Sequence, residues 1–111
     1  MNKEINLEFF DDDGFSNIKN TNCSYNELIR IFLLDVRTKI AFKVIRKIIS
    51  KKRGALPVGE FLTMKVENEN IIIRDDFDLD LDIDFLEMKS KKILFILKDW
   101  ESFLKKQGEL I

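Results

Sequence analysis

The residues whose spacing most suggests a chemical role are five aspartates that alternate with apolar residues in the second half of the chain. The aspartate row consists of Asp76, Asp78, Asp80, Asp82 and Asp84. The apolar residues between and beside them are Phe77, Leu79, Leu81, Ile83 and Phe85. Because successive side chains of a strand point to opposite faces, this pattern predicts a strand over residues 77–85 with one apolar and one acidic face.

Carboxylates on alternate positions of a strand lie about 6.6–6.8 Å apart. That spacing suits a line of Lys or Arg contacts and is close to the phosphate repeat of a nucleic acid backbone. We therefore predict that the aspartate row binds a cationic partner. The alternative is a solvated sheet face whose charges are balanced by lysines on neighbouring strands.

Calcium binding is the competing chemistry for the aspartate row. Asp76, Asp78, Asp80 and Glu87 fall on ligand positions of an EF-hand loop register. However, Leu81 stands where that loop needs glycine, and the flanking sequence does not predict two helices. We predict no metal site and no cofactor.

Catalysis has little support in the sequence. The chain contains no histidine, so it can form neither a Ser-His-Asp triad nor a histidine-liganded metal site. A glycine-rich phosphate-binding loop is also absent from the sequence. The single cysteine, Cys23, excludes an internal disulfide and is expected to be an inert thiol. We therefore predict that the protein is not an enzyme and name no catalytic residues.

The charges are segregated along the chain, although the net charge is only −1. Arg37, Lys39, Lys43, Arg46, Lys47, Lys51, Lys52 and Arg53 form a basic block. Residues 75–87 form an acidic one. Two interpretations remain open: the blocks neutralise each other in the fold, or they make a dipolar surface that orients a partner.

Nucleic acid is the alternative partner, and the basic helix over residues 43–53 would bind it. This segment lacks interleaved aromatic residues, and the whole chain is slightly acidic. We therefore expect its charges to be solvated, or paired with the aspartate row, rather than to contact a nucleic acid.

Two helices are predicted, near residues 24–51 and 90–107. Ser24 and Glu27 are spaced as a capping box at the start of the first. The apolar stripe of this helix drifts near residues 37–39, which indicates either a bend or two successive helices. Ser90 is predicted to cap the last helix.

The stripe of the last helix consists of Ile93, Ile96, Leu97, Trp100 and Leu104. Phe103 flanks this stripe, and it and Trp100 are expected in the core. Phe95 falls on the polar side. It is either an exposed contact residue or a sign that residues 92–97 form a strand.

Alternating apolar residues predict strands near residues 3–9, 59–67 and 70–75, besides the acidic strand over 77–85. A turn at residues 67–70 makes the middle two a hairpin. Gly54 is expected to end the preceding helix and Leu56-Pro57 to start a connection. The chain of 111 residues is therefore predicted to form a single α+β domain over residues 1–111, with a mainly antiparallel sheet packed against helices.

The sequence also bears on location. The N-terminal residues lack the apolar core of a signal peptide. The apolar runs are far shorter than the roughly 20 residues that span a bilayer. We predict a cytoplasmic protein with no membrane contact.

The second half of the chain resembles small bacterial immunity proteins of contact-dependent growth inhibition and related polymorphic-toxin systems. The likeness runs from the hairpin at residues 65–73 through the aspartate row to the apolar segment 93–104, and it is one of size, order and charge. Such proteins are small α/β domains with an acidic surface that block a toxin, frequently a nuclease. The resemblance implies an immunity protein that occludes the active site of a cognate toxin. The alternative remains a nucleic-acid-associated or regulatory protein using residues 43–53.

Overall fold

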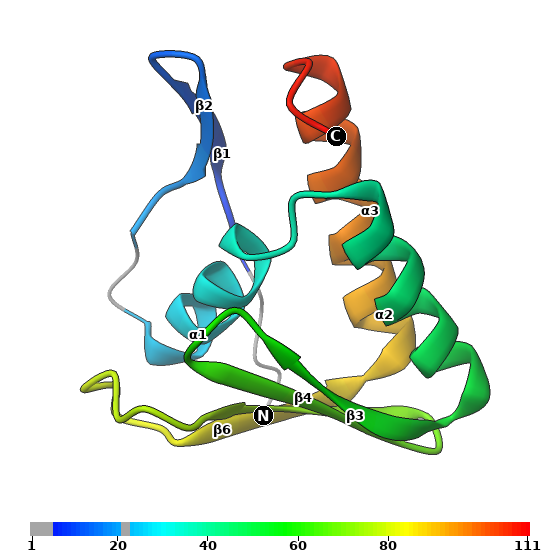
Figure 1. The fold of residues 1–111 in the computed structure, drawn as a ribbon. Coiled ribbons are helices and arrows are strands. Elements are labelled where there is room, and N and C mark those ends of the chain that lie inside the picture. Colours follow the sequence, from blue (N-terminus) through cyan, green and yellow to red (C-terminus); the bar gives the residue numbers. More distant parts are fainter. Residues whose placement is uncertain (1–5, 21–22) are drawn as a thin grey trace.

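A computed structural model describes residues 6–20 and 23–111 of the chain (Figure 1). The elements follow in the order β1 (Phe9–Asp12), β2 (Phe15–Ile18), α1 (Ser24–Leu34), α2 (Lys39–Lys51), β3 (Arg53–Val58), β4 (Leu62–Glu67), β5 (Asn70–Asp75), β6 (Phe85–Lys89) and α3 (Ser90–Lys106). They form one domain with a four-stranded antiparallel sheet and a separate antiparallel hairpin of β1 and β2. The predicted α+β class with an antiparallel sheet is confirmed.

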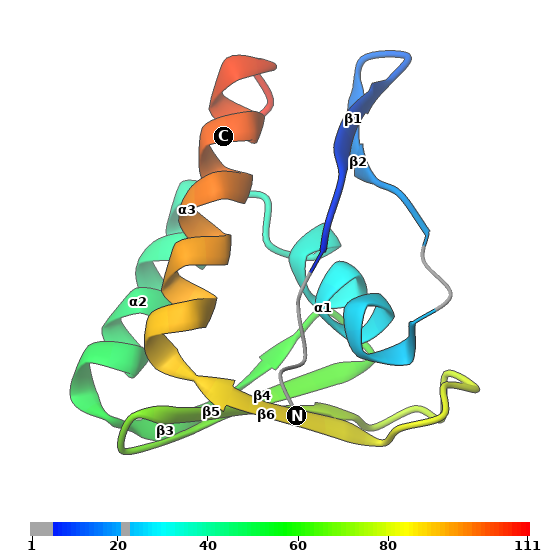
Figure 2. The same cartoon turned by 180° about the vertical axis from the view of Figure 1, so that it is seen from behind.

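The main sheet is a meander in the order β3-β4-β5-β6. Alternation along its strands decides which side chains enter the core: Leu62, Met64 and Val66 of β4 are buried, while Lys65 between them is exposed. The three helices all lie on the buried side of the sheet, and the hairpin of β1 and β2 stands away from it (Figures 1 and 2). Within the described ranges, no helix or strand covers the opposite face of the sheet.

The first predicted helix is two helices, which confirms one of the two interpretations of the drifting stripe. The α1 helix ends at Leu34, and α2 begins after Thr38, whose hydroxyl accepts a hydrogen bond from the Ala41 amide at 3.1 Å. The predicted capping box is wrong, because α1 already begins at Ser24 and no side chain caps it. Ser90 likewise is the first residue of α3 and not its cap.

The last helix agrees with the prediction. Trp100 and Leu97 are fully buried, whereas the Phe95 side chain is 69% exposed. Ile96, predicted to be buried, is half-buried. The helix runs without interruption from Ser90 to Lys106, so the alternative of a strand over residues 92–97 is wrong.

Two further predictions need correction. The predicted strand at 59–67 begins only at Leu62, and an additional strand, β3, precedes it. Pro57 lies in β3, which is tolerated because β3 is an edge strand and one side of its backbone needs no sheet partner. The first strand was predicted at 3–9; residues 1–5 lie outside the described part, and the structure has a hairpin over residues 9–18 instead. No helix in the described part is both long enough and apolar enough to cross a membrane.

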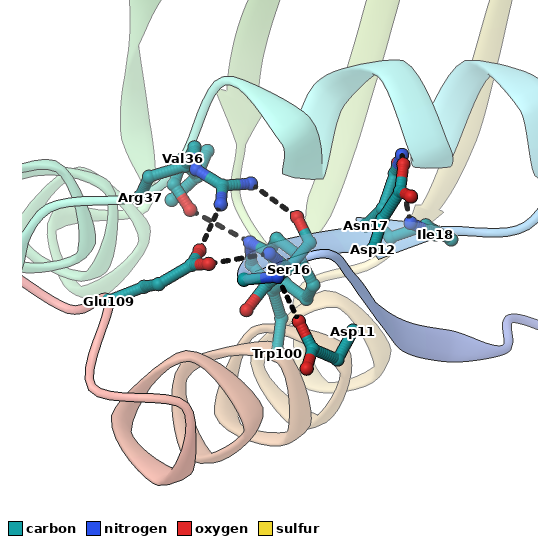
Figure 3. Close-up of polar contacts among 10 residues, drawn as sticks. Asp11, Asp12, Ser16, Asn17, Ile18, Val36, Arg37, Trp100 and Glu109 are labelled. Carbon is teal, nitrogen blue, oxygen red and sulfur yellow. Dashed lines mark hydrogen bonds and ion pairs between the residues drawn. The ribbon is translucent and has the colours of Figure 1, made fainter.

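A group of polar contacts fastens the hairpin to the end of the chain; we call it the Arg37 clasp (Figure 3). The two carboxylate oxygens of Glu109 accept hydrogen bonds from the Arg37 guanidinium at 2.5 Å and from the Ser16 amide at 2.7 Å. Arg37 also donates to the Ser16 carbonyl at 2.9 Å. The buried Trp100 indole donates to the Val36 carbonyl at 2.8 Å. The clasp therefore joins β2, the α1–α2 connection, α3 and the C-terminal segment.

Candidate functional site

The aspartate row lies in the loop between β5 and β6, and the predicted strand over residues 77–85 is wrong. We call residues 76–84 the acidic loop. Of the predicted strand, only Phe85 lies in β6. Asp78 and Asp80 have φ angles of 53° and 61°, in the left-handed region that no strand contains. Aspartate reaches this region more readily than most residues, because its short polar side chain can bond to the local backbone.

Hydrogen bonds made by Asp75 hold the acidic loop at its base. The Asp75 carboxylate accepts hydrogen bonds from the amides of Phe77 at 3.0 Å and Leu79 at 2.8 Å, which turns the chain out of β5. The Asp75 amide donates to the Asp84 carbonyl at 2.7 Å, which closes the loop.

A further hydrogen bond holds the middle of the acidic loop. The Asp82 amide donates to the Ser24 hydroxyl at 3.1 Å, so the loop is fastened to the start of α1. Ser24, predicted as a helix cap, therefore positions the acidic loop instead. The loop has a defined path although it contains no regular secondary structure.

The acidic loop keeps the two-sidedness that the alternation predicted. All five carboxylate side chains of the aspartate row are exposed. Leu79, Leu81 and Ile83 are half-buried and pack against the core. Phe77 differs from these three, because it is 65% exposed. Its ring lies 5.0 Å from that of Phe61, centroid to centroid.

The carboxylates of the acidic loop have no counter-ion within the protein, as far as residues 6–20 and 23–111 show. Asp76 accepts a hydrogen bond from the Thr63 hydroxyl, which is a neutral partner. Lysines of neighbouring strands, which were the alternative partners expected from the sequence, form no ion pair with the row in these ranges. The row therefore faces solvent without a paired cation in these ranges.

The basic block finds its carboxylates elsewhere. Arg46 of α2 binds Glu101 of α3 through two hydrogen bonds, at 2.8 and 3.1 Å. This pairing lowers the pKa of Glu101 and raises that of Arg46. Arg37 binds Glu109, and Lys52 lies 3.7 Å from Glu69. In the described ranges, the two charge blocks therefore do not neutralise each other by direct ion pairs.

A hollow of about 410 Å³ lies beside the acidic loop, where β6 meets α1. Its lining consists of Tyr25, Ile83, Asp84, Phe85, Leu86 and Glu87. The Tyr25 hydroxyl donates to the Glu87 carbonyl at 3.0 Å. Burial, and secondarily the Glu87 carboxylate, raises the pKa of Tyr25, so this phenol stays protonated and remains a donor at neutral pH.

A larger hollow, of about 640 Å³, lies at the opposite end of β6; we call it the lysine groove. Its lining consists of Leu7, Phe9, Lys89, Lys91, Lys92, Phe95, Ile96 and Asp99. The sequence patterns described above did not indicate this hollow. One feature of the sequence could have indicated it: lysines cluster at the first turn of a predicted helix, where the helix dipole disfavours positive charge.

The described residues contain no group of three or more His, Cys, Asp or Glu side chains placed to hold a metal ion. Carboxylates that point separately into solvent can attract cations but cannot form the closed oxygen shell of a calcium site. What the acidic loop can do chemically is to present negative charge and one exposed aromatic ring. Comparison of the chain with models of protein families, with curated proteins and with solved structures found no match.

Proposed function

We propose that the protein is an immunity protein, which neutralises a cognate toxin by placing the acidic loop against the toxin's cationic active-site surface. The observation that carries this proposal is the row of exposed aspartates, for which the described part of the chain supplies no counter-ion. Five like charges on one short loop repel one another and weaken the fold. A binding role explains why the loop nevertheless concentrates them at one place.

The shape of the acidic loop supports a binding role. Its backbone is fixed by contacts from Asp75 and Ser24, so a partner would not have to order it on binding. Fixing a loop in advance lowers the entropy cost of association. The exposed ring of Phe77 adds an aromatic anchor of the kind that contributes most of the energy in many interfaces.

Charge supports a nuclease as the toxin. A nuclease must bind phosphates, so its active-site surface is basic. The regular spacing of a strand no longer supports phosphate mimicry, because the aspartate row follows an irregular loop. Complementary charge alone still steers the two proteins together and covers the surface that the substrate needs. Such a toxin would act in the cytoplasm, which is where we place this protein.

The test is binding to the toxin domain encoded beside this protein's gene. We expect a complex that co-purifies and an association rate that falls as salt rises, because the Debye length shrinks from about 30 Å at 0.01 M to about 8 Å at 0.15 M ionic strength. Replacing Asp78, Asp80, Asp82 and Asp84 by Asn should weaken binding by roughly tenfold or more. Asn keeps the size of the side chain and tolerates the left-handed φ of Asp78 and Asp80.

A matched control separates the acidic loop from net charge. The pair Asp80→Asn/Asp82→Asn removes two charges from the loop, and Asp12→Asn/Asp13→Asn removes two from the β1–β2 hairpin. Each pair includes one left-handed residue, Asp80 or Asp13. Only the loop pair should weaken toxin binding. Equal effects of both pairs, or no complex at all, would contradict the proposal.

The nucleic-acid alternative has a separate readout. If α2 contacts RNA or DNA, the protein alone should bind it with a steep dependence on salt. Lys43 and Lys47 are exposed on α2, but Arg46 between them is held by Glu101. We therefore expect no such binding at physiological salt.

A further inference from the structure

The lysine groove combines an apolar floor with a cationic rim. Phe9 and Ile96 are half-buried, and the exposed ring of Phe95 stands at the side of the groove. Exposed Lys89 and Lys91 stand at the start of α3, on the same hollow. Such a groove fits an occupant that is both acidic and apolar.

The position of these lysines costs stability in the isolated molecule. The N-terminal end of a helix carries a partial positive charge, and acidic residues are favoured there. The first turn of α3 contains no acidic residue, and no side chain caps it. Lys89 and Lys91 form no ion pair within the described ranges. Asp99 is the one carboxylate among the described lining residues, so the rim keeps a positive net charge toward an incoming ligand.

A segment with the matching chemistry is present in the same chain. The acidic loop alternates aspartates with apolar residues and exposes the Phe77 ring. Among residues 6–20 and 23–111, its carboxylates have no counter-ion, and neither do Lys89 and Lys91 of the groove. One molecule cannot bring the two together, because they lie at opposite ends of β6, a five-residue strand about 17 Å long (Figures 1 and 2).

We propose that the lysine groove binds the acidic loop of a second copy of this chain. Because loop and groove lie at the two ends of one strand, a two-fold axis allows both contacts to form at once, each copy giving its loop and receiving its partner's. Two opposite-charge contacts and two aromatic anchors then hold the dimer. Self-association and toxin binding would compete for the acidic loop. The proposal itself does not depend on the toxin, since it concerns the free protein.

The experiment is a charge exchange followed by sedimentation equilibrium of the full chain. The first variant, Lys89→Glu/Lys91→Glu, makes both loop and groove acidic. The second, Asp76→Lys/Asp82→Lys/Asp84→Lys, leaves two aspartates against three lysines in the loop, so that loop and groove are both basic. None of these three positions has a left-handed φ. At about 50 mM salt the unmodified chain should dimerise, and each variant alone should dimerise at least about tenfold more weakly.

An equimolar mixture of the two variants should dimerise again, because each acidic loop then meets a basic groove and each basic loop an acidic one. This recovery also shows that both variants are folded. The control Lys43→Glu/Lys47→Glu changes as much charge on α2 as the first variant changes in the groove, and it should leave the dimer intact. Phe95→Ser should weaken dimerisation without lowering thermal stability.

Four results would overturn the proposal. The first is a chain that stays monomeric at every concentration and salt tested. The second is a dimer that neither charge variant weakens. The third is a mixture that stays as monomeric as its components. A salt-insensitive dimer would place the contact on another surface.

Discussion

The Arg37 clasp and the acidic loop use the same chemical group in opposite ways. In the clasp, the Glu109 side chain is 17% exposed, and both of its carboxylate oxygens bind donors. In the acidic loop, five carboxylates are exposed, and none of them has a cationic partner in the part of the chain that the structure describes. A carboxylate with bound donors is part of the fold, whereas one left in solvent is available to another molecule.

The two regions also differ in the distance along the chain that they connect. Glu109 and Arg37 are 72 residues apart, and Trp100 and Val36 are 64 apart. The base of the acidic loop is closed by neighbours, since Asp75 contacts Phe77, Leu79 and Asp84, and a single bond to Ser24 fastens its middle to a distant part of the chain. Damage to the clasp should therefore lower global stability, while changes in the acidic loop should alter binding with little effect on the fold.

The largest expected effect is at Trp100, in the clasp. Its ring is fully buried and lies 5.1 Å from Phe9 and 6.1 Å from Phe103, centroid to centroid. Trp100→Ala should lower the free energy of unfolding by about 3–5 kcal/mol. Urea denaturation measures this change. Phe95→Ala on the exposed side of the same helix is the control and should change stability by less than about 0.5 kcal/mol. An unchanged midpoint for Trp100→Ala would show that the indole is not a core residue.

Glu109→Ala should have the next largest effect. It leaves the Arg37 guanidinium and the Ser16 amide without their acceptor, and unfolding free energy should fall by about 1–3 kcal/mol. Glu109→Gln keeps one carbonyl acceptor and should recover part of the loss. The same denaturation series measures both. If Glu109→Ala leaves the free energy of unfolding unchanged, water replaces the carboxylate as the acceptor, and the clasp does not stabilise the fold.

Neutralising the acidic loop should leave the free protein as stable as before, or more stable. Replacing Asp78, Asp80, Asp82 and Asp84 by Asn removes repulsion and breaks no ion pair between residues that the structure describes. The thermal midpoint of the free protein should therefore stay the same or rise. A lower midpoint would reveal internal partners for these carboxylates and would remove the contrast with the clasp.

The smallest effect is expected at Asp35, which follows α1 and lies against Gly59. Burial, and secondarily the charge of Glu60, raises the pKa of Asp35. The folded state thus holds this proton more tightly than the unfolded state, and stability falls as pH rises from the ordinary pKa through the raised one.

Asp35→Asn should therefore stabilise the protein at pH 7 and have almost no effect near pH 3, below both pKa values. Thermal melts of the two proteins at each pH give the comparison. An equal gain at both pH values would show that the charge of Asp35 is not the cause.

Sequence periodicity predicted the elements whose side chains pack on one continuous face. The α3 helix shows this best, since Trp100 and Phe95 fall on the sides that the helical stripe assigns to them. Period-two alternation misled at the aspartate row. Alternation indicates which side chains point inward, but a strand also needs a neighbouring strand to pair with its backbone. Here the Asp75 carboxylate binds the Phe77 and Leu79 amides and turns the chain out of the sheet before such pairing can continue.

The remaining errors share a physical cause. The strand β3 was not predicted because it contains Pro57, which is disfavoured inside a sheet. Proline is tolerated in an edge strand, but the local sequence does not show that a segment lies at a sheet edge. Glu109 and Arg37 carried no signal of pairing, since contacts across 72 residues depend on the finished fold. The side-chain bond of Ser24 could not be foreseen for the same reason: the hydroxyl binds the Asp82 amide, far along the chain.

The left-handed residues of the acidic loop limit which acid the chain can use there. Glutamate supplies the same charge as aspartate, but its longer side chain is less suited to local backbone bonds and does not share the ease of aspartate in the left-handed region. At Asp78 and Asp80, with φ of 53° and 61°, the shorter acid is therefore required for the path of the chain as well as for its charge. Positions 76, 82 and 84 carry no such requirement. Replacing aspartate by glutamate should therefore be tolerated at these three positions and disfavoured at Asp78 and Asp80.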